Sequence, residues 1–235
     1  MSTPGKPATT GKRPQRADAR TNRERILNVA EEVFGRGGEA ASTEEVARLA
    51  NVGIATVFRH FPTKAALLAA VLVRRFDHLR EQAEALLDAA DPGPAFFDFF
   101  SHLVADAASK IAIAEALLEA SGDTGDDGNG GGDGDGGGDG DGGGGDDRAG
   151  DSDAVQASNG LREAVGALLR RAQHAGAVRA DAELPEVYAL LVATSRAAAH
   201  AHLDEPVRAR MLAIVFDGLA PLPNARTRTR TRKQT

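Results

Sequence analysis

The sequence contains no cysteine, no tryptophan and only one tyrosine. Without cysteine, the chain cannot build a disulfide framework, a thiolate zinc site or a cysteine nucleophile. Long hydrophobic runs are also missing, because the longest one, residues 65–73, is too short to span a bilayer. The polar start of the chain does not have the apolar stretch of a signal peptide. These absences predict a protein without a membrane segment, and we expect it in the cytoplasm.

Motifs that hold nucleotides or catalytic metals are absent as well. The sequence has no P-loop, no dinucleotide-binding glycine pattern, no His-Glu-x-x-His zinc pattern and no Gly-x-Ser-x-Gly nucleophile elbow. His200 and His202 do not share a helix face, so a metal pair is not expected there. We therefore expect a protein that is not an enzyme and that uses no cofactor.

Charge is segregated along the chain, and the formal net charge of -6 conceals this. Residues 1–80 carry 14 basic and 8 acidic side chains, which is a net charge of +6. Residues 121–153 carry 11 aspartates and one arginine, which is a net charge of -10. Residues 226–235 add five basic side chains and no acidic one. A basic front end of this kind indicates a polyanionic partner.

Abundant alanine and leucine favour helices over strands. Apolar spacing, capping residues and helix breakers divide the chain into about nine helices without a convincing strand, which predicts an all-α fold. The first helix is expected to begin at a capping box with Thr21 as its N-cap, and the second at Ser42. Thr63 and Asp204 are expected to cap later helices, and Pro185 to lie in a first turn.

Three segments have too few apolar side chains to form a core. We interpret residues 1–19 as a disordered basic arm, residues 122–153 as a disordered Gly/Asp linker and residues 222–235 as a disordered basic tail. Calcium binding by the Gly/Asp segment is an alternative, but its spacing matches neither an EF-hand nor an apolar-containing Asp-Gly repeat. Organised domains are therefore expected at residues 20–65 and 66–221, the second interrupted by the linker.

Residues 42–61 read STEEVARLANVGIATVFRHF, which indicates a short capped helix, a tight turn and a second short helix. This is the arrangement of a helix-turn-helix, in which the first helix supports the second and the second enters the major groove of DNA. Small or polar residues at the front of the second helix suit base contacts, and Val57 and Phe61 suit packing behind it. From spacing alone, an ordinary helical hairpin with solvated charges is equally open.

Residues 20–67 closely resemble the DNA-binding domain of TetR-family repressors. The resemblance rests on residues 34–38, residues 43–47 and the ordered stretch ANVGIATVFRHFPTKAAL at residues 50–67. A looser similarity to the C-terminal domain of some TetR-type regulators runs from Leu161 to Pro221.

Three positions depart from the family pattern within the turn and the second helix. Asn51, Gly53 and Phe58 stand where the family usually has glycine, serine and tyrosine. The family's tyrosine donates a hydroxyl to a DNA phosphate, and Phe58 cannot make that contact.

The resemblance implies a sequence-specific transcriptional regulator, in which a small-molecule ligand releases the repressor from a palindromic operator. It also implies an omega-shaped homodimer joined through the last two long helices. The implied partners are double-stranded operator DNA, an unknown effector and a second copy of the chain. Two alternatives remain, a protein that coats DNA without sequence preference, as nucleoid proteins do, and an activator.

The expected site residues follow from the motif and from the helices that come after it. DNA contacts are expected from the motif positions and the nearest basic side chains, which are Arg20, Thr43, Val52, Gly53, Ile54, Ala55, Thr56, Phe58, Arg59, His60 and Lys64. Ligand contacts are expected from an aromatic cluster and side chains on neighbouring helices, which are Phe96, Phe97, Phe100, His102, Leu168, Tyr188 and Arg196. Aromatic clusters are more often plain core, and Tyr188 and Arg196 equally suit a dimer interface, so these interpretations stay open.

Overall fold

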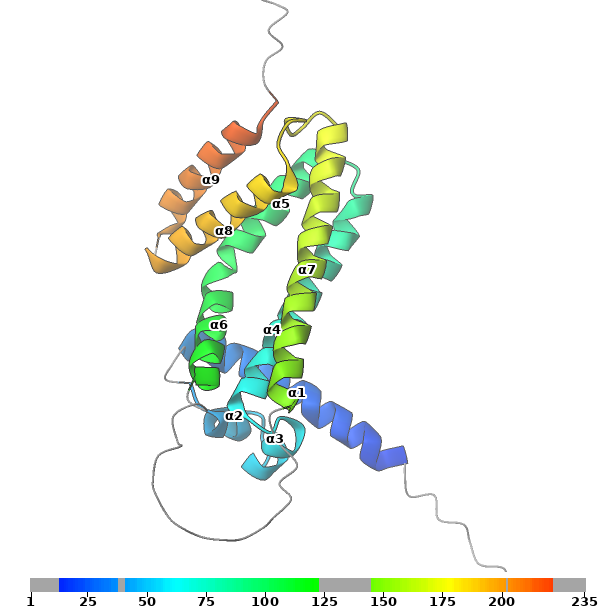
Figure 1. The fold of residues 1–235 in the computed structure, drawn as a ribbon, viewed down its shortest axis with the longest axis vertical. Coiled ribbons are helices and arrows are strands. Elements are labelled where there is room, and N and C mark those ends of the chain that lie inside the picture. Colours follow the sequence, from blue (N-terminus) through cyan, green and yellow to red (C-terminus); the bar gives the residue numbers. More distant parts are fainter. Residues whose placement is uncertain (1–12, 38–40, 123–144, 202, 222–235) are drawn as a thin grey trace, which may run out of the picture. The chain divides into compact units, whose positions relative to one another are not determined.

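The computed structural model describes residues 13–37, 41–122, 145–201 and 203–221, and these ranges hold nine α-helices and no strand (Figure 1). The all-α prediction is therefore confirmed. The helices are α1 (Arg13–Gly37), α2 (Thr43–Leu49), α3 (Ile54–His60), α4 (Lys64–Ala85), α5 (Pro92–Ala105), α6 (Ala107–Gly122), α7 (Gly145–His174), α8 (Leu184–His200) and α9 (Glu205–Leu219), with a 3-10 turn at Leu86–Asp88. In this part of the chain no single helix is long and apolar enough to cross a membrane. Helix α3 and the segment Lys64–Asp88, which meet at a bend of 65°, are together long and apolar enough by length and composition alone.

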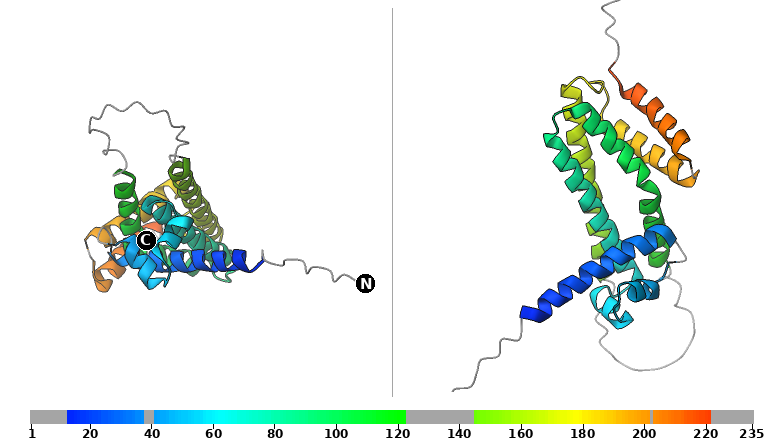
Figure 2. Two further views of the ribbon diagram at one scale, coloured as in Figure 1. Left: turned by 90° about the horizontal axis from the view of Figure 1, so that it is seen from below. Right: turned by 180° about the vertical axis from the view of Figure 1, so that it is seen from behind.

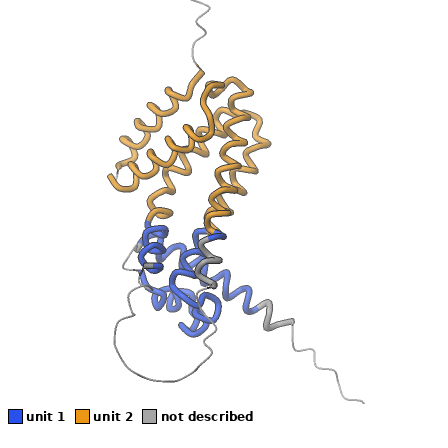
Figure 3. Tube along the Cα trace, viewed as in Figure 1, with its two compact units in different colours: residues 1–72, 112–153 blue, residues 73–111, 154–235 orange. Residues whose placement is uncertain are grey.

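The chain folds into two compact units, which Figure 3 colours separately. The first unit comprises residues 1–72 and 112–153, and the second comprises residues 73–111 and 154–235. The boundaries between the units fall inside α4, α6 and α7. The first unit therefore continues seven residues beyond the domain end predicted at residue 65, and it includes a later part of the chain that the prediction assigned to the second domain.

In the first unit, α1, α2 and α3 pack against one another (Figure 2). Ile26, Ala30 and Phe34 are fully buried on α1, at the fourfold spacing that places side chains on one helix face. Val46 on α2 and Val57 on α3 are also fully buried. These apolar contacts fix the orientation of α3, whose opposite side is left for other contacts.

The first helix begins earlier than the capping pattern predicted. Because α1 starts at Arg13, Thr21 lies inside the helix with its side chain exposed and is not an N-cap. Pro14 is compatible with a first helical turn, and no further proline or glycine follows before Gly35, so nothing in this stretch stops the helix. The prediction of a disordered arm is wrong for residues 13–19, and the rest of the predicted arm lies outside the described residues.

The Gly/Asp segment is shorter than predicted at both ends. Residue 122 closes α6, and α7 already begins at Gly145, so the prediction of a disordered linker is wrong for residues 122 and 145–153. Glycine becomes sparse and alanine reappears after Gly145, which lowers the entropic cost of forming a helix there. The remaining residues of the linker, with the calcium alternative, and the predicted basic tail from residue 222 onward lie outside the described residues.

Several predicted helix starts are confirmed. Ser42 Oγ accepts a hydrogen bond from the Glu45 backbone N at 3.2 Å, and Thr63 Oγ1 accepts one from the Ala66 backbone N at 3.0 Å. Asp204 caps α9 in the same way, by accepting from a backbone N at 3.0 Å. The predicted proline lies in the first turn of α8. These caps satisfy backbone donors that a helix start leaves unpaired.

The core of the second unit is built mainly from α5 and α7, with smaller contributions from α4, α8 and α9. Phe96, Phe99 and Phe100 on α5 are at most 4% exposed, and Leu168 and Val187 are buried in the same cluster. Phe97 packs against this cluster from its edge, with its ring 4.7 Å from that of Phe216 on α9. The four phenylalanines of α5 are therefore all part of one core.

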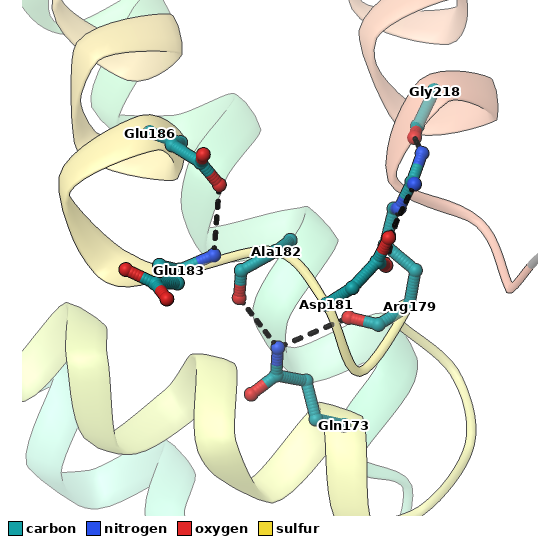
Figure 4. A network of polar contacts seen from close by, with 7 residues as sticks. All are labelled: Gln173, Arg179, Asp181, Ala182, Glu183, Glu186 and Gly218. Carbon is teal, nitrogen blue, oxygen red and sulfur yellow. Dashed lines mark hydrogen bonds and ion pairs between the residues drawn. The ribbon is translucent and has the colours of Figure 1, made fainter.

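A polar clamp fastens the loop between α7 and α8 to the end of α9 (Figure 4). The Arg179 backbone N donates to Leu219 O at 2.9 Å, and its guanidinium donates to both carboxylate oxygens of Asp181 at 2.7 and 2.6 Å. These hydrogen bonds lower the pKa of Asp181 to about 2. Gln173 Nε2 donates to the carbonyls of Arg179 and Ala182 at 3.0 and 2.8 Å. We call this group the Arg179 clamp.

Candidate nucleic-acid interface

The turn between α2 and α3 depends on left-handed backbone at Asn51, where φ is 53°. The Asn51 N donates to Arg48 O at 3.2 Å, and the Val52 N donates to Ala47 O at 3.0 Å, so α2 ends and the chain reverses. Glycine is favoured at such a position, and asparagine is the side chain that tolerates it best. The replacement of the family's glycine by Asn51 therefore keeps the turn.

Gly53 precedes α3 with extended backbone, φ -69° and ψ 145°. Its carbonyl accepts from the Thr56 backbone N at 2.8 Å, but no side chain caps the helix. A Cβ at this position would meet nothing closer than Thr56 Oγ1 at 3.9 Å, so a larger residue would fit. With no side-chain cap, α3 is held by its backbone bonds and by the burial of Val57.

The two faces of α3 differ sharply in their surroundings. Val57 is fully buried, and Phe61, which follows the helix, is 3% exposed. On the outer face, Ile54 is 37% and Phe58 is 42% exposed, and both are large apolar side chains. Ala55 and Arg59 are exposed beside them, while Thr56 and His60 are partly exposed. The sequence therefore folds into a helix that is anchored at its back and exposes two large apolar side chains beside Arg59 at its front.

Other predicted DNA contacts lie in different environments. Thr43 is only 8% exposed, so its side chain serves the packing of α2 and is not presented at the surface. Val52 is partly exposed and Gly53 is exposed, both in the turn that leads into α3. Val52 and Gly53 thus lie at the surface next to the outer residues of α3, whereas Thr43 is buried.

Two of the basic side chains predicted to contact DNA lie outside α3. Lys64, at the start of α4, is partly exposed and places its Nζ 5.7 Å from the centre of the Phe34 ring. Arg20, on α1, is 83% exposed and lies 3.6 Å from the Glu24 carboxylate, a surface pair that contributes little to stability.

Sequence reasoning missed Arg23, whose guanidinium carbon lies 5.1 Å from the centre of the Phe61 ring, directly after α3. No local sequence pattern predicts this contact, because Arg23 and Phe61 are 38 positions apart.

The residues predicted to bind a ligand lie in the second unit, where five of the seven belong to or pack against one apolar core and the other two are exposed. Phe96, Phe100 and Leu168 are at most 2% exposed within the core. Tyr188 is partly buried at the core edge, where the Arg162 guanidinium carbon lies 5.3 Å from its ring centre. His102 and Arg196 are exposed. Of the seven predicted residues, Phe97 and Tyr188 are the two that both touch the core and remain partly accessible.

A partly buried group of charges in the second unit was not found from the sequence. Asp106, between α5 and α6, accepts hydrogen bonds from Arg75 of α4 through both carboxylate oxygens. Lys110 Nζ lies 3.7 Å from the same carboxylate and donates to Leu103 O at 3.2 Å. Burial lowers the pKa of Lys110 below its usual value. Two cations therefore share one carboxylate, with side chains between 13% and 20% exposed.

Comparison with known protein families gives two matches. Residues 26–71 match the family model described as "Bacterial regulatory proteins, tetR family". Residues 144–221 match the model described as "Transcriptional regulator SbtR-like, C-terminal domain". The first match contains the turn and helix whose geometry is described above, and the second runs from the start of α7 past the end of α9.

Solved structures and curated proteins give similar results. The chain is 33% identical to the TetR transcription regulatory protein from Mycobacterium vanbaalenii, with a TM-score of 0.62 over 88% of this chain and 99% of that one. It is 26% identical to the TetR transcriptional regulator SCO0520 from Streptomyces coelicolor, with a TM-score of 0.63 over 86% and 99%. It is also 29% identical over 77 residues to the HTH-type transcriptional regulator SAR0097 of Staphylococcus aureus (strain MRSA252). That match spans 32% of this chain and 40% of the relative's length.

Proposed function

The chain belongs to the TetR family of DNA-binding transcriptional regulators, and on this premise we propose that it is a repressor that a small-molecule effector releases from a near-palindromic operator. The observation that carries the proposal is the two-sided α3, with Val57 buried behind and Ile54, Phe58 and Arg59 exposed in front. A helix held in this way is suited to enter the major groove while flanking cations contact phosphates. We place the protein in the cytoplasm with its operator, and we assign it no catalytic role.

The test is a mobility-shift titration on the DNA upstream of its own gene, with and without excess random DNA. A repressor that reads sequence gives a discrete shift that survives the competitor. Arg59→Ala is expected to weaken the shift, whereas Arg36→Ala, which removes another exposed arginine, in the last turn of α1, is the matched control. A shift that the competitor removes in proportion to its amount would instead support a DNA-coating protein. A reporter gene fused to the operator then distinguishes repression from activation.

We further propose that the protein is a homodimer joined through α8 and α9. Both helices expose large apolar side chains, with Leu190 42%, Val207 48% and Ile214 73% exposed. On α8, Leu190, Ala193 and Ala197 are exposed at spacings of three and four residues, which places them on one helix face. Small and apolar residues on paired helices suit close packing against a second copy.

Sedimentation of an Ile214→Asp variant tests the dimer. A charge at the centre of an apolar interface is expected to give monomers and weaker operator binding. Leu118→Asp is the matched control, because Leu118 on α6 is 74% exposed and lies outside the proposed interface. If both variants remain dimeric, α8 and α9 do not form the interface.

We place the effector in the second unit, against Phe97 and Tyr188. These two predicted ligand residues touch the core and stay partly accessible, whereas Phe96, Phe100 and Leu168 are enclosed by it. An effector must bind the DNA-free state more tightly than the DNA-bound state, because only a difference in affinity shifts the equilibrium. A compound that raises the melting temperature and also releases the operator complex meets this condition. Tyr188→Ala should then weaken that compound's binding, and an unchanged affinity would place the effector elsewhere.

A further inference from the structure

The outer face of α3 offers few hydrogen-bonding groups for reading bases. Ile54 and Phe58 are four residues apart, so they lie on one helix face, and they are 37% and 42% exposed. Ala55 is exposed next to them. The side chains of these three residues neither donate nor accept hydrogen bonds. The exposed side of α3 therefore presents two large apolar side chains and one small one, with Arg59 beside them.

An apolar side chain can distinguish base pairs in the major groove by one feature only. The donors and acceptors on the base edges need polar partners, whereas the C5-methyl group of thymine is itself apolar. We propose that Ile54 and Phe58 read thymine methyl groups, so that each operator half-site carries T·A pairs at the positions facing these two side chains. The inference rests on the proposed function, since it needs α3 to lie in the major groove.

The charge of the N-terminal part of the sequence and two arginines at α3 favour DNA as the occupant of this apolar surface. Residues 1–80 carry a net charge of +6, which complements a polyanion. Arg59 is exposed on α3 itself, and Arg23 is held beside Phe61 at the end of that helix. Cations beside exposed apolar side chains suit a DNA interface, in which phosphate contacts and base contacts are made by different side chains.

Removing the thymine methyl group without changing any hydrogen bond gives the sharpest test. The full-length protein is first used to select binding sites from a pool of random double-stranded DNA. Each thymine of the selected half-site is then replaced by uracil, which lacks only the C5-methyl group. At the two reading positions we expect about a fourfold loss of affinity per methyl group removed, the usual effect of losing one buried methyl-sized contact. Uracil at other positions should change the affinity less.

Variants of the protein assign each methyl group to its partner. In Ile54→Ala the affinity is expected to be lower for thymine DNA and to become insensitive to uracil at one position. In Phe58→Ala the same should occur at the other position. Both side chains are exposed and alanine is a good helix former, so helicity measured by circular dichroism should be unchanged. Leu49→Ala is the control, because Leu49 is 51% exposed on α2 and should leave the uracil sensitivity intact.

The possible outcomes separate this inference from the proposed function. A palindromic site whose affinity falls with uracil in the wild type, but not in the two variants, supports both. A palindromic site that is insensitive to uracil overturns the inference and leaves the sequence-reading regulator in place. If the selection yields no preferred sequence, the proposed function fails, and the reading of thymine fails with it.

Discussion

Replacing Asp106 by asparagine is expected to destabilise the protein by about 3 kcal/mol, whereas replacing Lys110 by methionine should change the stability by less than about 1 kcal/mol. The contrast arises because one carboxylate serves two cations. Asp106 accepts from both nitrogens of a bidentate Arg75 contact and lies 3.7 Å from Lys110. Its removal leaves both cations without this partner, while removal of Lys110 leaves the Arg75–Asp106 pair complete.

The magnitudes follow from the burial of the group. Breaking a fully buried ion pair by removing one partner costs about 3–5 kcal/mol. Arg75 and Asp106 are 13% and 20% exposed, so the lower end of that range applies. For a chain of this length, about 2–4 °C of melting temperature per kcal/mol predicts a decrease of roughly 6–12 °C. Lys110→Met loses one hydrogen bond, worth about 1 kcal/mol, but it also removes a cation that burial disfavours.

The pH dependence of stability gives a second comparison, between the wild type and Lys110→Met. Burial lowers the pKa of Lys110 below the 10.5 of an unfolded lysine. Between these two values the unfolded chain binds more protons than the folded one, so the contribution of Lys110 to stability becomes more favourable as pH rises toward 10.5. The wild type should therefore gain stability relative to Lys110→Met in this window and show a constant difference below it.

Urea denaturation followed by circular dichroism measures these differences. Asp98→Asn is the control, because Asp98 is an exposed aspartate of α5 and its replacement should change stability by at most about 0.5 kcal/mol. The reasoning is refuted if Asp106→Asn is no less stable than Asp98→Asn. It is equally refuted if Lys110→Met loses as much stability as Asp106→Asn, since the two cations would then not be competing for one carboxylate.

Three further predictions concern packing, DNA contact and the Gly/Asp segment. Gly93→Ala should destabilise the protein by about 1–3 kcal/mol, because the added Cβ would lie 2.7 Å from the Cβ of Ala177. Gly218→Ala is the control and should not destabilise it, because its Cβ would meet nothing within 4 Å. Equal melting temperatures of the two variants would exclude a tight contact at Gly93. Thr56→Ala should weaken operator binding about tenfold at an unchanged melting temperature, as expected for a lost hydrogen bond to a phosphate or base, and unchanged binding would remove Thr56 from the interface. Replacing residues 123–144 by a short Gly/Ser linker should leave the melting temperature and operator affinity nearly unchanged, because the segment has no apolar side chain; a large fall in either would show that it is structural.

The sequence predicted best those features that depend on neighbouring residues. The tight turn after α2 and the caps at Ser42, Thr63 and Asp204 each involve groups at most five positions apart, and all are present. Thr21 shows the limit of such patterns. It carries the residues of a capping box, yet the helix continues through it because no breaker precedes it. A capping box therefore predicts a helix start only where a helix-breaking residue precedes it.

Contacts between distant residues could not be predicted from one sequence. Arg75 and Asp106 are 31 positions apart, and nothing in the pattern of either helix indicates that they meet. The burial of Thr43 has the same origin, since a threonine at a helix start is compatible with either the core or the surface until the packing of α1 against α2 is known. Ile54 and Phe58 were predicted as DNA contacts from their positions in the motif. That these two apolar side chains are exposed to solvent is known only from the structure.

The Arg179 clamp has a consequence for where the chain can be shortened. Its main-chain bond from Arg179 to Leu219 joins residues 40 positions apart, so it closes a loop that contains all of α8 and α9. The two helices should therefore lose their protection from hydrogen exchange together and not one after the other. An exopeptidase that trims from the C-terminus removes no part of the clamp until it reaches Leu219. At that residue we expect a sudden rise in susceptibility to cleavage, because the loop between α7 and α8 is released in the same step.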